Sequence, residues 1–446
     1  MKEEILSIVS ADAVDISKLK SLLPDMNTVD IAEVFENLEK DKTIQLFRLL
    51  PKIIAADVFA SMDSDEQQIV IEALTDTEIG EIINKLFVDD AVDFIEEMPA
   101  NVVKRVLQNV LPVKRKLINQ ILQYPDDSAG SIMTTEYVEL PEDATVQKAF
   151  DDIRRTGVNK ETIYTCYVIR RDRLLVGVVS AKNLMLAKVD DRIGDIMDTN
   201  LVFANTTDDQ EAIAGLFKKY GLLAMPVVDK EQRLVGIITV DDIVQVIEEE
   251  NTEDFEKMSG LRPSDEPYLK TSIMKLAKNR IIWLLVLMLS ATVTGGIISS
   301  FEDALAVLPI LVAFIPMLMD TGGNAGSQSS TLIIRGMALG EISLGDLIKV
   351  IWREIRIGAI CGIALGLINF LRIFLMNGKN LLLSATVTIS LFITVLMAKS
   401  VGCILPMVAK KLKIDPAIMA APLITTIVDS ASLIIYFSIA KVIFHL

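Results

Sequence analysis

The side chain that most needs a chemical explanation is a carboxylate inside the last long apolar run. Asp429 lies in Pro422-Leu-Ile-Thr-Thr-Ile-Val-Asp429-Ser-Ala-Ser432, with no basic residue three or four positions away. A charge in such a run is costly unless it faces a partner or a watery cavity. A cation site in a pathway would account for Asp429; a protonated acid bonded to another helix is the alternative.

A second polar stretch interrupts an earlier apolar run and reads Asp320-Thr-Gly-Gly-Asn-Ala-Gly-Ser-Gln-Ser-Ser330. Its amides and hydroxyls are unsuited to lipid, so it should lie against protein or line a cavity. The alternative is that its small residues serve only close helix packing. Asp429, Asp320 and Asn324 offer hard oxygen ligands, which suit Mg²⁺ or Ca²⁺. Because Mg²⁺ keeps most of its waters, we expect a wide site for the hydrated ion.

The remaining composition excludes other chemistries. The single histidine, His445, leaves no histidine zinc site or Ser-His triad, and the three scattered cysteines form no disulfide framework or thiolate site. Neither a Walker A loop nor a phosphorylatable ATPase motif is present, so we expect neither ATP-driven pumping nor an enzyme. The first thirty residues carry acids and no long apolar run, which argues against a secretory signal peptide.

Charge and hydropathy divide the chain near residue 270. The 446 residues are 51% hydrophobic, with a mean hydropathy of +0.43 and a net charge of −16. The first 270 residues hold 30 basic and 52 acidic residues, a net of −22, whereas residues 271–446 hold 14 and 8, a net of +6. An acidic soluble half is therefore joined to an apolar half, without the basic footprint of a nucleic-acid binder.

The apolar half predicts a membrane domain, residues 271–446, with five spanning helices. They cover residues 281–300, 305–332, 356–376, 382–407 and 416–440. Eleven basic residues gather in the segments on one side: Lys270, Lys275, Lys278, Arg280, Arg335, Lys349, Arg353, Arg356, Lys410, Lys411 and Lys413. The opposite side has only three. This asymmetry predicts a multi-pass protein of the plasma membrane with a cytoplasmic N-terminus and an external C-terminus.

Residues 1–125 predict short amphipathic helices, because apolar residues recur at steps of three and four. Leu-Leu-Pro or a similar group repeats before several of these helices, and proline fits the first turn. We expect a small acidic α-superhelix, with an irregular helical bundle as the alternative.

Residues 126–195 and 196–245 form two repeats of a β-α-β-β-α pattern. The pieces Met225-Pro-Val-Val-Asp229 and Gly236-Ile-Ile-Thr-Val-Asp-Asp242 resemble a tandem pair of CBS domains, a regulatory α/β module. An acidic helix over residues 246–270 should link it to the membrane domain. Such a charge run is often only a solvated helix face, but it lies where a coupling element would sit.

The whole chain resembles the MgtE family of magnesium transport proteins. The matching pieces are Tyr124-Pro-Asp-Asp-Ser-Ala-Gly-Ser-Ile-Met-Thr-Thr135, the CBS pair, the acidic linker, Thr321-Gly-Gly-Asn-Ala-Gly-Ser-Gln328 and Asp415-Pro with the Asp429 segment. The resemblance implies a homodimer whose ten spans line one pore for Mg²⁺. The pore residues that it implies are Asp429, Thr425, Ala421, Asn324, Ser327, Asp320 and Asp415. Some members carry Asn where Ser327 and Ala421 stand, so we expect a selectivity filter with fewer amide groups here.

The resemblance also implies a gate that senses cytoplasmic Mg²⁺. Ions would bridge acids of the helical domain, the CBS pair and the linker, or plug, helix, and so close the pore. These acids are Asp89, Asp90, Asp93, Asp209, Glu211, Asp242, Glu250, Glu253 and Asp254. One position expected to be acidic is Gln245. For any single acid, an ordinary solvated surface position is the alternative.

ATP binding in the CBS pair is a further prediction. In such pairs a Ser/Thr-x-x-Asp after the last strand often contacts ribose, and the second repeat has Thr239 and Asp242. Asp191 and Arg192, between the repeats, are further candidates for a nucleotide contact. Two rivals to a gated Mg²⁺ channel stay open: a transporter of cobalt or another divalent cation, with or without ion coupling, and a membrane-anchored nucleotide or ion sensor without transport.

Overall fold

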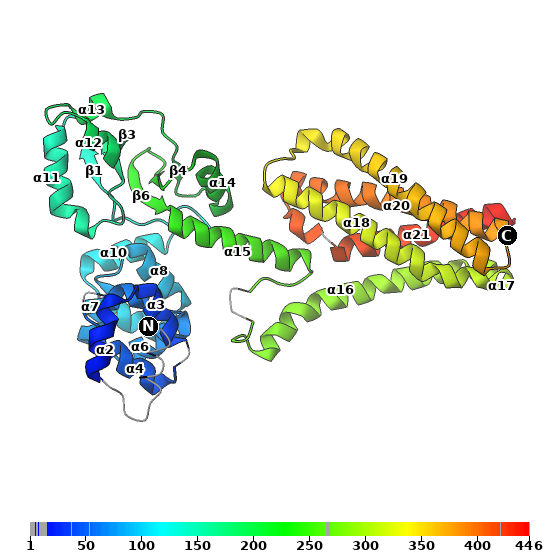
Figure 1. The fold of residues 1–446 in the computed structure, drawn as a ribbon, viewed down its shortest axis with the longest axis horizontal. Helices are drawn as coiled ribbons and strands as arrows, with labels where there is room; N and C mark the ends of the chain where they lie inside the picture. The colour runs from blue at the N-terminus through cyan, green and yellow to red at the C-terminus, as the bar shows by residue number, and fades with distance from the viewer. Residues whose placement is uncertain are drawn as a thin grey trace. The chain divides into compact units, whose positions relative to one another are not determined.

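The computed structural model describes residues 5, 8, 16–36, 38–52, 54–264, 268–419 and 421–445 (Figure 1). It divides into two compact units, Met1–Ile247 and Glu248–Leu446, which are described separately. The first unit contains the helical domain and two small sheets, and the second consists of long helices. The predicted fold class, an α-superhelix followed by an α/β CBS pair and a helical membrane domain, is confirmed.

Short helices build the N-terminal domain, and each packs on the helix two positions away in sequence. Thus α3 contacts α5, α4 contacts α6, α7 contacts α9 and α8 contacts α10, which is the stacking of a superhelix. Phe35, Phe47, Phe59 and Phe94 form a chain of edge-to-face ring contacts through the core. The helices are α2 (Ile16–Leu22), α3 (Thr28–Phe35), α4 (Lys40–Leu49), α5 (Ala55–Ala60), α6 (Ser64–Ala73), α7 (Asp76–Ile83), α8 (Val88–Glu97), α9 (Ala100–Asn109) and α10 (Pro112–Ile121).

Each CBS repeat contains a three-stranded sheet with one parallel and one antiparallel pair. In the first, β1 pairs parallel with β2, and β2 pairs antiparallel with β3; β4, β5 and β6 repeat this arrangement. The predicted β-α-β-β-α order is present in both. The elements are β1 (Glu139–Pro141), α11 (Val146–Thr156), β2 (Thr165–Ile169), β3 (Leu175–Ser180), α12 (Ala181–Leu186), α13 (Ile193–Ile196), β4 (Ala204–Asn205), α14 (Gln210–Tyr220), β5 (Ala224–Val228) and β6 (Leu234–Thr239).

The predicted boundaries between the repeats differ from the structural ones, because each repeat lends its first segment to the other. Thr134 bridges Ile237 in the second sheet, and Asp198 bridges Val178 in the first. The exchange is symmetric: a Cβ on Gly236 would meet the Met133 side chain, and one on Gly177 would meet Met197. The two repeats therefore fold as one interlocked module rather than as blocks 126–195 and 196–245.

The acidic linker is one continuous helix that begins inside the CBS module. Helix α15 (Val240–Met258) starts directly after β6, so the predicted boundary at residue 246 falls within it. Gly260 follows with a φ of 70°, a left-handed conformation that glycine adopts without strain. The helix therefore ends at Met258, before Gly260 and Pro263, and the predicted linker of 246–270 also includes the residues that follow it.

The second unit contains α16 (Ile273–Ser300), α17 (Glu302–Val307), α18 (Ile315–Ala338), α19 (Leu347–Met376), α20 (Leu381–Lys411) and α21 (Ala421–Phe444). Of the described helical segments, four are long and apolar enough to cross a membrane: Ile273–Ser300, Leu344–Met376, Leu381–Lys411 and Pro416–Phe444. The fifth predicted span is α18, which has 24 residues and carries the polar stretch.

The extent predicted for that fifth span, residues 305–332, was wrong. Residues 302–307 form the separate helix α17, and Pro309–Phe314 is a 3₁₀ segment. Pro309 and Pro316 lack a backbone donor, so the chain restarts its hydrogen-bonding pattern at each. Helix α18 then runs to Ala338 and packs against both α20 and α21.

Candidate cation site

Helix α18 carries a stripe of exposed polar side chains on a single face. Asp320, Asn324, Gln328 and Thr331 are exposed, and Ser327 is half-buried. Steps of three and four residues place them on one face of the helix. The Asn324 Nδ2 donates a hydrogen bond of 3.2 Å to the Asp320 carboxylate. We call these five residues the polar stripe.

Helix α21 presents Asp429 and Thr425 next to α18. Asp429 is half-buried, and its carboxylate and that of Asp320 repel each other across the contact between the two helices. Glycine makes the approach possible: a Cβ on Gly323 would lie 3.0 Å from the Thr425 side chain. The Thr425 hydroxyl donates to the carbonyl of Pro422 at 2.9 Å. The two motifs that were identified separately in the sequence are thus neighbours in the fold.

The other predicted pore residues are placed differently. The Ser327 hydroxyl is buried and has no hydrogen-bond partner within the described part of the chain. Asp415 lies outside the stripe, just before the 3₁₀ segment η5 (Pro416–Met419), and accepts a 2.8 Å bond from the Ala417 amide. Ala421 is the first residue of α21, and its side chain lies outside what the structure describes.

A lysine that was not predicted joins α15 to the segment before α21. The Lys257 Nζ lies 2.5 Å from Glu253 and 2.7 Å from Asp415. Burial alone would lower the pKa of Lys257, but the hydrogen bonds that it donates to Asp415 and Glu253 raise it above its usual value. Burial, and then the nearby Asp415 charge, raises the pKa of Asp254. The four-residue step from Glu253 to Lys257 was a visible signal for half of this contact.

In the first unit, acids of α8 approach an acid at the start of α15. Asp89 is 8% exposed, and its burial, with Asp90 and Asp242 nearby, raises its pKa well above the usual value. Burial and Asp242 raise the pKa of Asp90 to about 6. Burial, followed by Asp90 and Asp242, raises the pKa of Glu161 to about 8. We call Asp89, Asp90, Glu161 and Asp242 the acidic cluster; Glu161 was not predicted.

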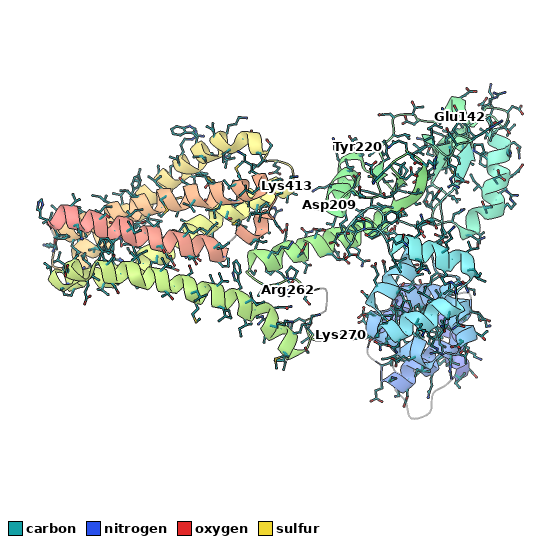
Figure 2. All side chains as sticks on the ribbon, turned by 180° about the vertical axis from the view of Figure 1, so that it is seen from behind. Glu142, Asp209, Tyr220, Arg262, Lys270 and Lys413 are labelled. Atoms are coloured by element: carbon teal, nitrogen blue, oxygen red, sulfur yellow. The ribbon has the colours of Figure 1, made fainter. Side chains whose placement is uncertain are left out.

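The acids assigned to regulation are therefore only partly brought together. Asp209 caps the N-terminus of α14 by accepting from the amides of Glu211 and Ala212 (Figure 2). Asp93 lies on α8, Glu211 on α14, and Glu250 on α15. Among the described residues, no three acids come close enough to hold one metal ion.

Three family models match the helical domain, the CBS pair and the part of the membrane domain that carries the polar stripe and Asp429. The MgtE divalent cation transporter model matches residues 315–439, the MgtE intracellular N domain matches 26–127, and CBS domains match 129–190 and 193–249. The magnesium transporter MgtE of Thermus thermophilus is 34% identical over 98% of both chains. The chain belongs to the MgtE family of magnesium transporters. MgtE of Bacillus subtilis is 33% identical, over 96% of this chain and 95% of the relative.

Two solved structures from the MgtE group resemble the soluble part. The cytosolic domain of the Mg²⁺ channel MgtE in complex with ATP is 33% identical, with a TM-score of 0.50, over 52% of this chain and 95% of that one. The soluble part of a magnesium transporter is 27% identical, with a TM-score of 0.52, over 56% and 99%. The relatives that match nearly the whole chain are named as magnesium transporters.

The nucleotide residues predicted for this MgtE chain fall into two places. The Thr239 hydroxyl donates to Asp242 at 2.5 Å, at the junction of β6 and α15. Arg192 instead lines a hollow of about 710 Å³ beside the turn from β2 to β3. The Asp191 carboxylate accepts from the Lys188 amide and so caps a turn. The predicted set therefore does not form one site.

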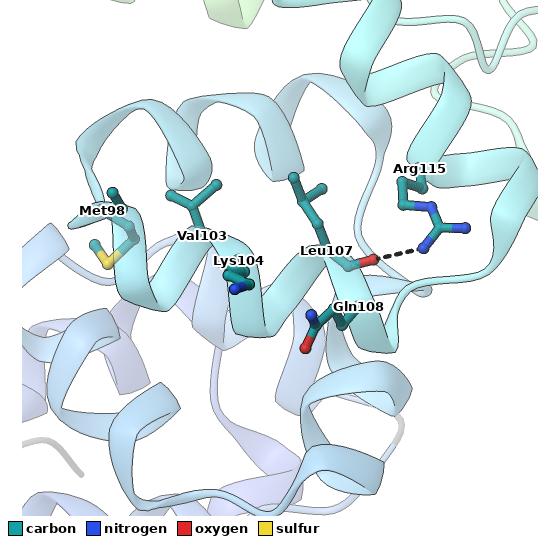
Figure 3. A pocket seen from close by; sticks show the side chains of 7 residues that line it. Met98, Val103, Lys104, Leu107, Gln108 and Arg115 are labelled. Carbon is teal, nitrogen blue, oxygen red and sulfur yellow. Dashed lines mark hydrogen bonds between the residues drawn. The ribbon is translucent and has the colours of Figure 1, made fainter.

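A second hollow, of about 580 Å³, lies on the helical domain of this MgtE chain (Figure 3). Apolar side chains including Met98 and Val103 line it, together with Lys104, and Arg115 donates to the Leu107 carbonyl at 3.3 Å. It has two cationic side chains and no acid in its lining, so it does not suit a divalent cation.

Proposed function

We propose that this chain is a Mg²⁺ channel of the plasma membrane, open to Mg²⁺ flow down its electrochemical gradient and closed by cytoplasmic Mg²⁺. The observation that carries the proposal is the polar stripe of α18 next to Asp429 of α21. Both lie in long helices of the membrane domain, where exposed amides and carboxylates require water or protein as neighbours. Hard oxygen atoms in a wide arrangement suit a hydrated Mg²⁺ ion.

The same stripe supports a homodimer. In a single chain Asp320, Asn324 and Gln328 are exposed, although they belong to a helix at membrane depth. A second copy placed against this face would shield it from lipid and supply the opposite wall of a pathway. The proposed pore thus has ten spans and two copies of Asp429. The excess of basic residues in segments on one side supports a cytoplasmic N-terminus and CBS module.

Gating is proposed to use the acids of the cytoplasmic part. A net charge of −22 in the first 270 residues repels itself, and the buried acidic cluster concentrates that repulsion. Divalent ions would relieve the repulsion and favour a compact, closed arrangement. Linkage then requires that Mg²⁺ bind the closed arrangement more tightly than the open one. Helix α15 would transmit the change, because it carries both Asp242 and the Lys257 contact with Asp415.

ATP is proposed as a modulator that binds the CBS pair. The support is a structural relative whose cytosolic domain was solved with ATP. In this chain, Thr239 and Asp242 are already hydrogen-bonded to each other at the end of β6. The bound nucleotide would compete for the same Asp242 that belongs to the acidic cluster, so ATP and cytoplasmic Mg²⁺ are expected to influence each other.

Growth of a host that lacks Mg²⁺ uptake tests the transport proposal. Wild type should rescue growth at low Mg²⁺, and Asp429→Ala should not, at equal membrane expression. Asp303→Ala is the matched control, because Asp303 is an exposed acid of α17 in the same unit. Rescue by Asp429→Ala would overturn the pore assignment, and failure of the wild type would favour a sensor without transport.

Patch-clamp recording tests the gate. Wild-type current carried by Mg²⁺ should fall as Mg²⁺ on the cytoplasmic face rises, and Asp429→Ala should carry little current at any concentration. A current that is insensitive to cytoplasmic Mg²⁺ would contradict gating without contradicting transport. Co²⁺ flux in liposomes that exceeds Mg²⁺ flux would identify the chain as a transporter for a different ion.

A further inference from the structure

A network of charged side chains lies inside the membrane domain, away from the polar stripe. The Ser329 Oγ is 2.6 Å from the Glu354 carboxylate, and the Lys399 Nζ is 3.3 Å from the same Oγ. Lys399 and Glu354 are themselves 3.9 Å apart. Ser329 lies on α18 and is 1% exposed, Glu354 lies on α19 and is 7% exposed, and Lys399 lies on α20 and is 6% exposed.

The hydrogen bonds of this network have a defined direction. An ammonium group can only donate and a carboxylate can only accept. Lys399 therefore donates to the Ser329 oxygen, and the Ser329 hydroxyl donates its single proton to Glu354. The hydroxyl is the central link, and it fixes the distance between the two charges. Because both charges are buried, loss of either one leaves the other without its compensating partner.

Ser329 lies on the face of α18 that is opposite most of the polar stripe. It is nine residues after Asp320 and two residues from both Ser327 and Thr331. At about 100° per residue, Ser329 lies roughly 160° to 180° around the helix from these three residues, about 140° from Asn324 and about 100° from Gln328. A contact that holds Ser329 toward α19 and α20 therefore also holds the stripe toward the proposed pathway.

The other contacts of α18 do not fix its rotation as well. Gly322 faces Thr394 and Val428, and Gly326 faces Ile424 and the backbone of α20. Contacts between glycine and apolar atoms are non-directional, so neighbouring rotations of the helix differ little in energy. Hydrogen bonds lose strength steeply with angle and distance. Two further hydrogen bonds tie α18 to its neighbours: Ser330 donates to the Met419 carbonyl at 3.1 Å, and Lys410 donates to the Met337 carbonyl at 3.3 Å. The Lys399–Ser329–Glu354 network is the buried, charged contact that joins α18 to both α19 and α20.

We propose that Lys399, Ser329 and Glu354 are positioning residues that fix the rotation and register of α18, and thereby set the selectivity of the pore. The Lys399 ammonium compensates the buried charge of Glu354, so no bound metal ion is needed to stabilise that carboxylate. The inference rests on the proposed channel function. It assigns selectivity partly to residues that never touch the permeating ion.

Recordings from reconstituted full-length protein in Mg²⁺/Na⁺ gradients test the proposal. Ser329→Ala removes only the bridging hydroxyl and should shift the reversal potential toward lower Mg²⁺ preference. Ser384→Ala is the matched control, because Ser384 is buried on α20 and bonds only the Asn380 carbonyl of its own helix start. Its reversal potential should equal that of the wild type. An unshifted Ser329→Ala would overturn the proposal.

The charged pair provides an independent test. Glu354→Gln and Lys399→Met should each lower the melting temperature, since each leaves one buried charge unpaired. The double variant Glu354→Gln/Lys399→Met should recover most of the melting temperature but keep the shifted reversal potential. A double variant with wild-type selectivity would show that the pair serves stability alone. Absence of Mg²⁺ current in the wild type would instead contradict the channel function itself, so the two failures are distinguishable.

Discussion

The Nζ of Lys257 lies 2.7 Å from Oδ2 of Asp415, so a tethered cation joins the end of α15 to the segment that leads into α21. The same ammonium is 2.5 Å from Glu253. Lys257 therefore neutralises acids between these two segments, which is part of the role proposed for a bridging Mg²⁺ ion. This contact holds α15 at the membrane domain even when no divalent ion is bound.

Lys257→Met should raise the open probability when no divalent cation is present. Without the ammonium, Glu253, Asp254 and Asp415 repel one another, and the closed arrangement loses stability. A partly exposed ion pair contributes up to about 1 kcal/mol, so the ratio of open to closed channels should rise by up to about fivefold. Single-channel recording in chelator measures this ratio. Saturating cytoplasmic Mg²⁺ should still close the variant.

The control for this variant is Lys278→Met, which removes an exposed lysine of α16 and should leave the open probability unchanged. An open probability of Lys257→Met at or below that of the wild type would show that the contact does not favour closure.

The acidic cluster predicts that the cytoplasmic part loses stability as pH rises. A carboxyl whose pKa is higher in the folded state binds its proton more tightly there, so its contribution is present at low pH and is lost as pH rises through the folded pKa. For Asp90 this loss accumulates from its ordinary pKa of 3.8 up to about 6, and for Glu161 from 4.5 up to about 8. Melting temperatures of the full chain, measured in chelator from pH 5 to pH 9, should decline across this range.

Two variants separate the contributions to that decline. Glu161→Gln should flatten the profile most between pH 6 and pH 8, where Asp90 no longer contributes, and should leave the part of the decline below pH 6 that is due to Asp90. Asp190→Asn, an exposed acid between the repeats, should leave the slope unchanged. Added Mg²⁺ should restore the melting temperature at pH 8 more than at pH 5, because the carboxylates are then ionised. A profile that rises with pH would contradict the burial of these acids.

Much of the site could be predicted from local sequence. Asp429 and the stretch from Asp320 to Ser330 were recognisable because polar groups stand out in apolar runs, where their cost demands a reason. The repeat pattern also predicted both sheets correctly. These features depend on residue type and spacing within a few turns of one element.

The parts that could not be predicted depend on which elements meet in space. Nothing near Thr134 in the sequence shows that it bridges Ile237 of the other repeat. Glu161 looks like a solvated loop acid until the fold buries it beside Asp90 and Asp242. Lys399 was not singled out in the sequence, where nothing links it to Glu354, 45 positions earlier and on another helix.

The split of the predicted nucleotide residues gives a direct test of where ATP binds. Thr239→Val removes the hydroxyl beside Asp242 and should weaken ATP binding, while Arg192→Ala should not, since Arg192 lines a separate hollow. Isothermal titration of the full chain with ATP measures both. The reverse pattern would move the nucleotide to the hollow next to the turn from β2 to β3. No heat of binding in the wild type would remove ATP from the proposed function.

Close packing of α18 on α20 predicts a strict requirement for glycine at position 402. A Cβ on Gly402 would fall on the backbone carbonyl of Gly326, which no side-chain rotation can relieve. Gly402→Ala should therefore push the helices apart and cost roughly 1–3 kcal/mol of stability. Gly402→Ala should also lower the Mg²⁺ current, because Gly326 lies one residue before Ser327 of the polar stripe.

The control variant is Gly295→Ala in α16, where the new Cβ meets no atom within 4 Å, and the melting temperature of this variant should match that of the wild type. Equal melting temperatures for both variants would show that α18 and α20 are farther apart than described.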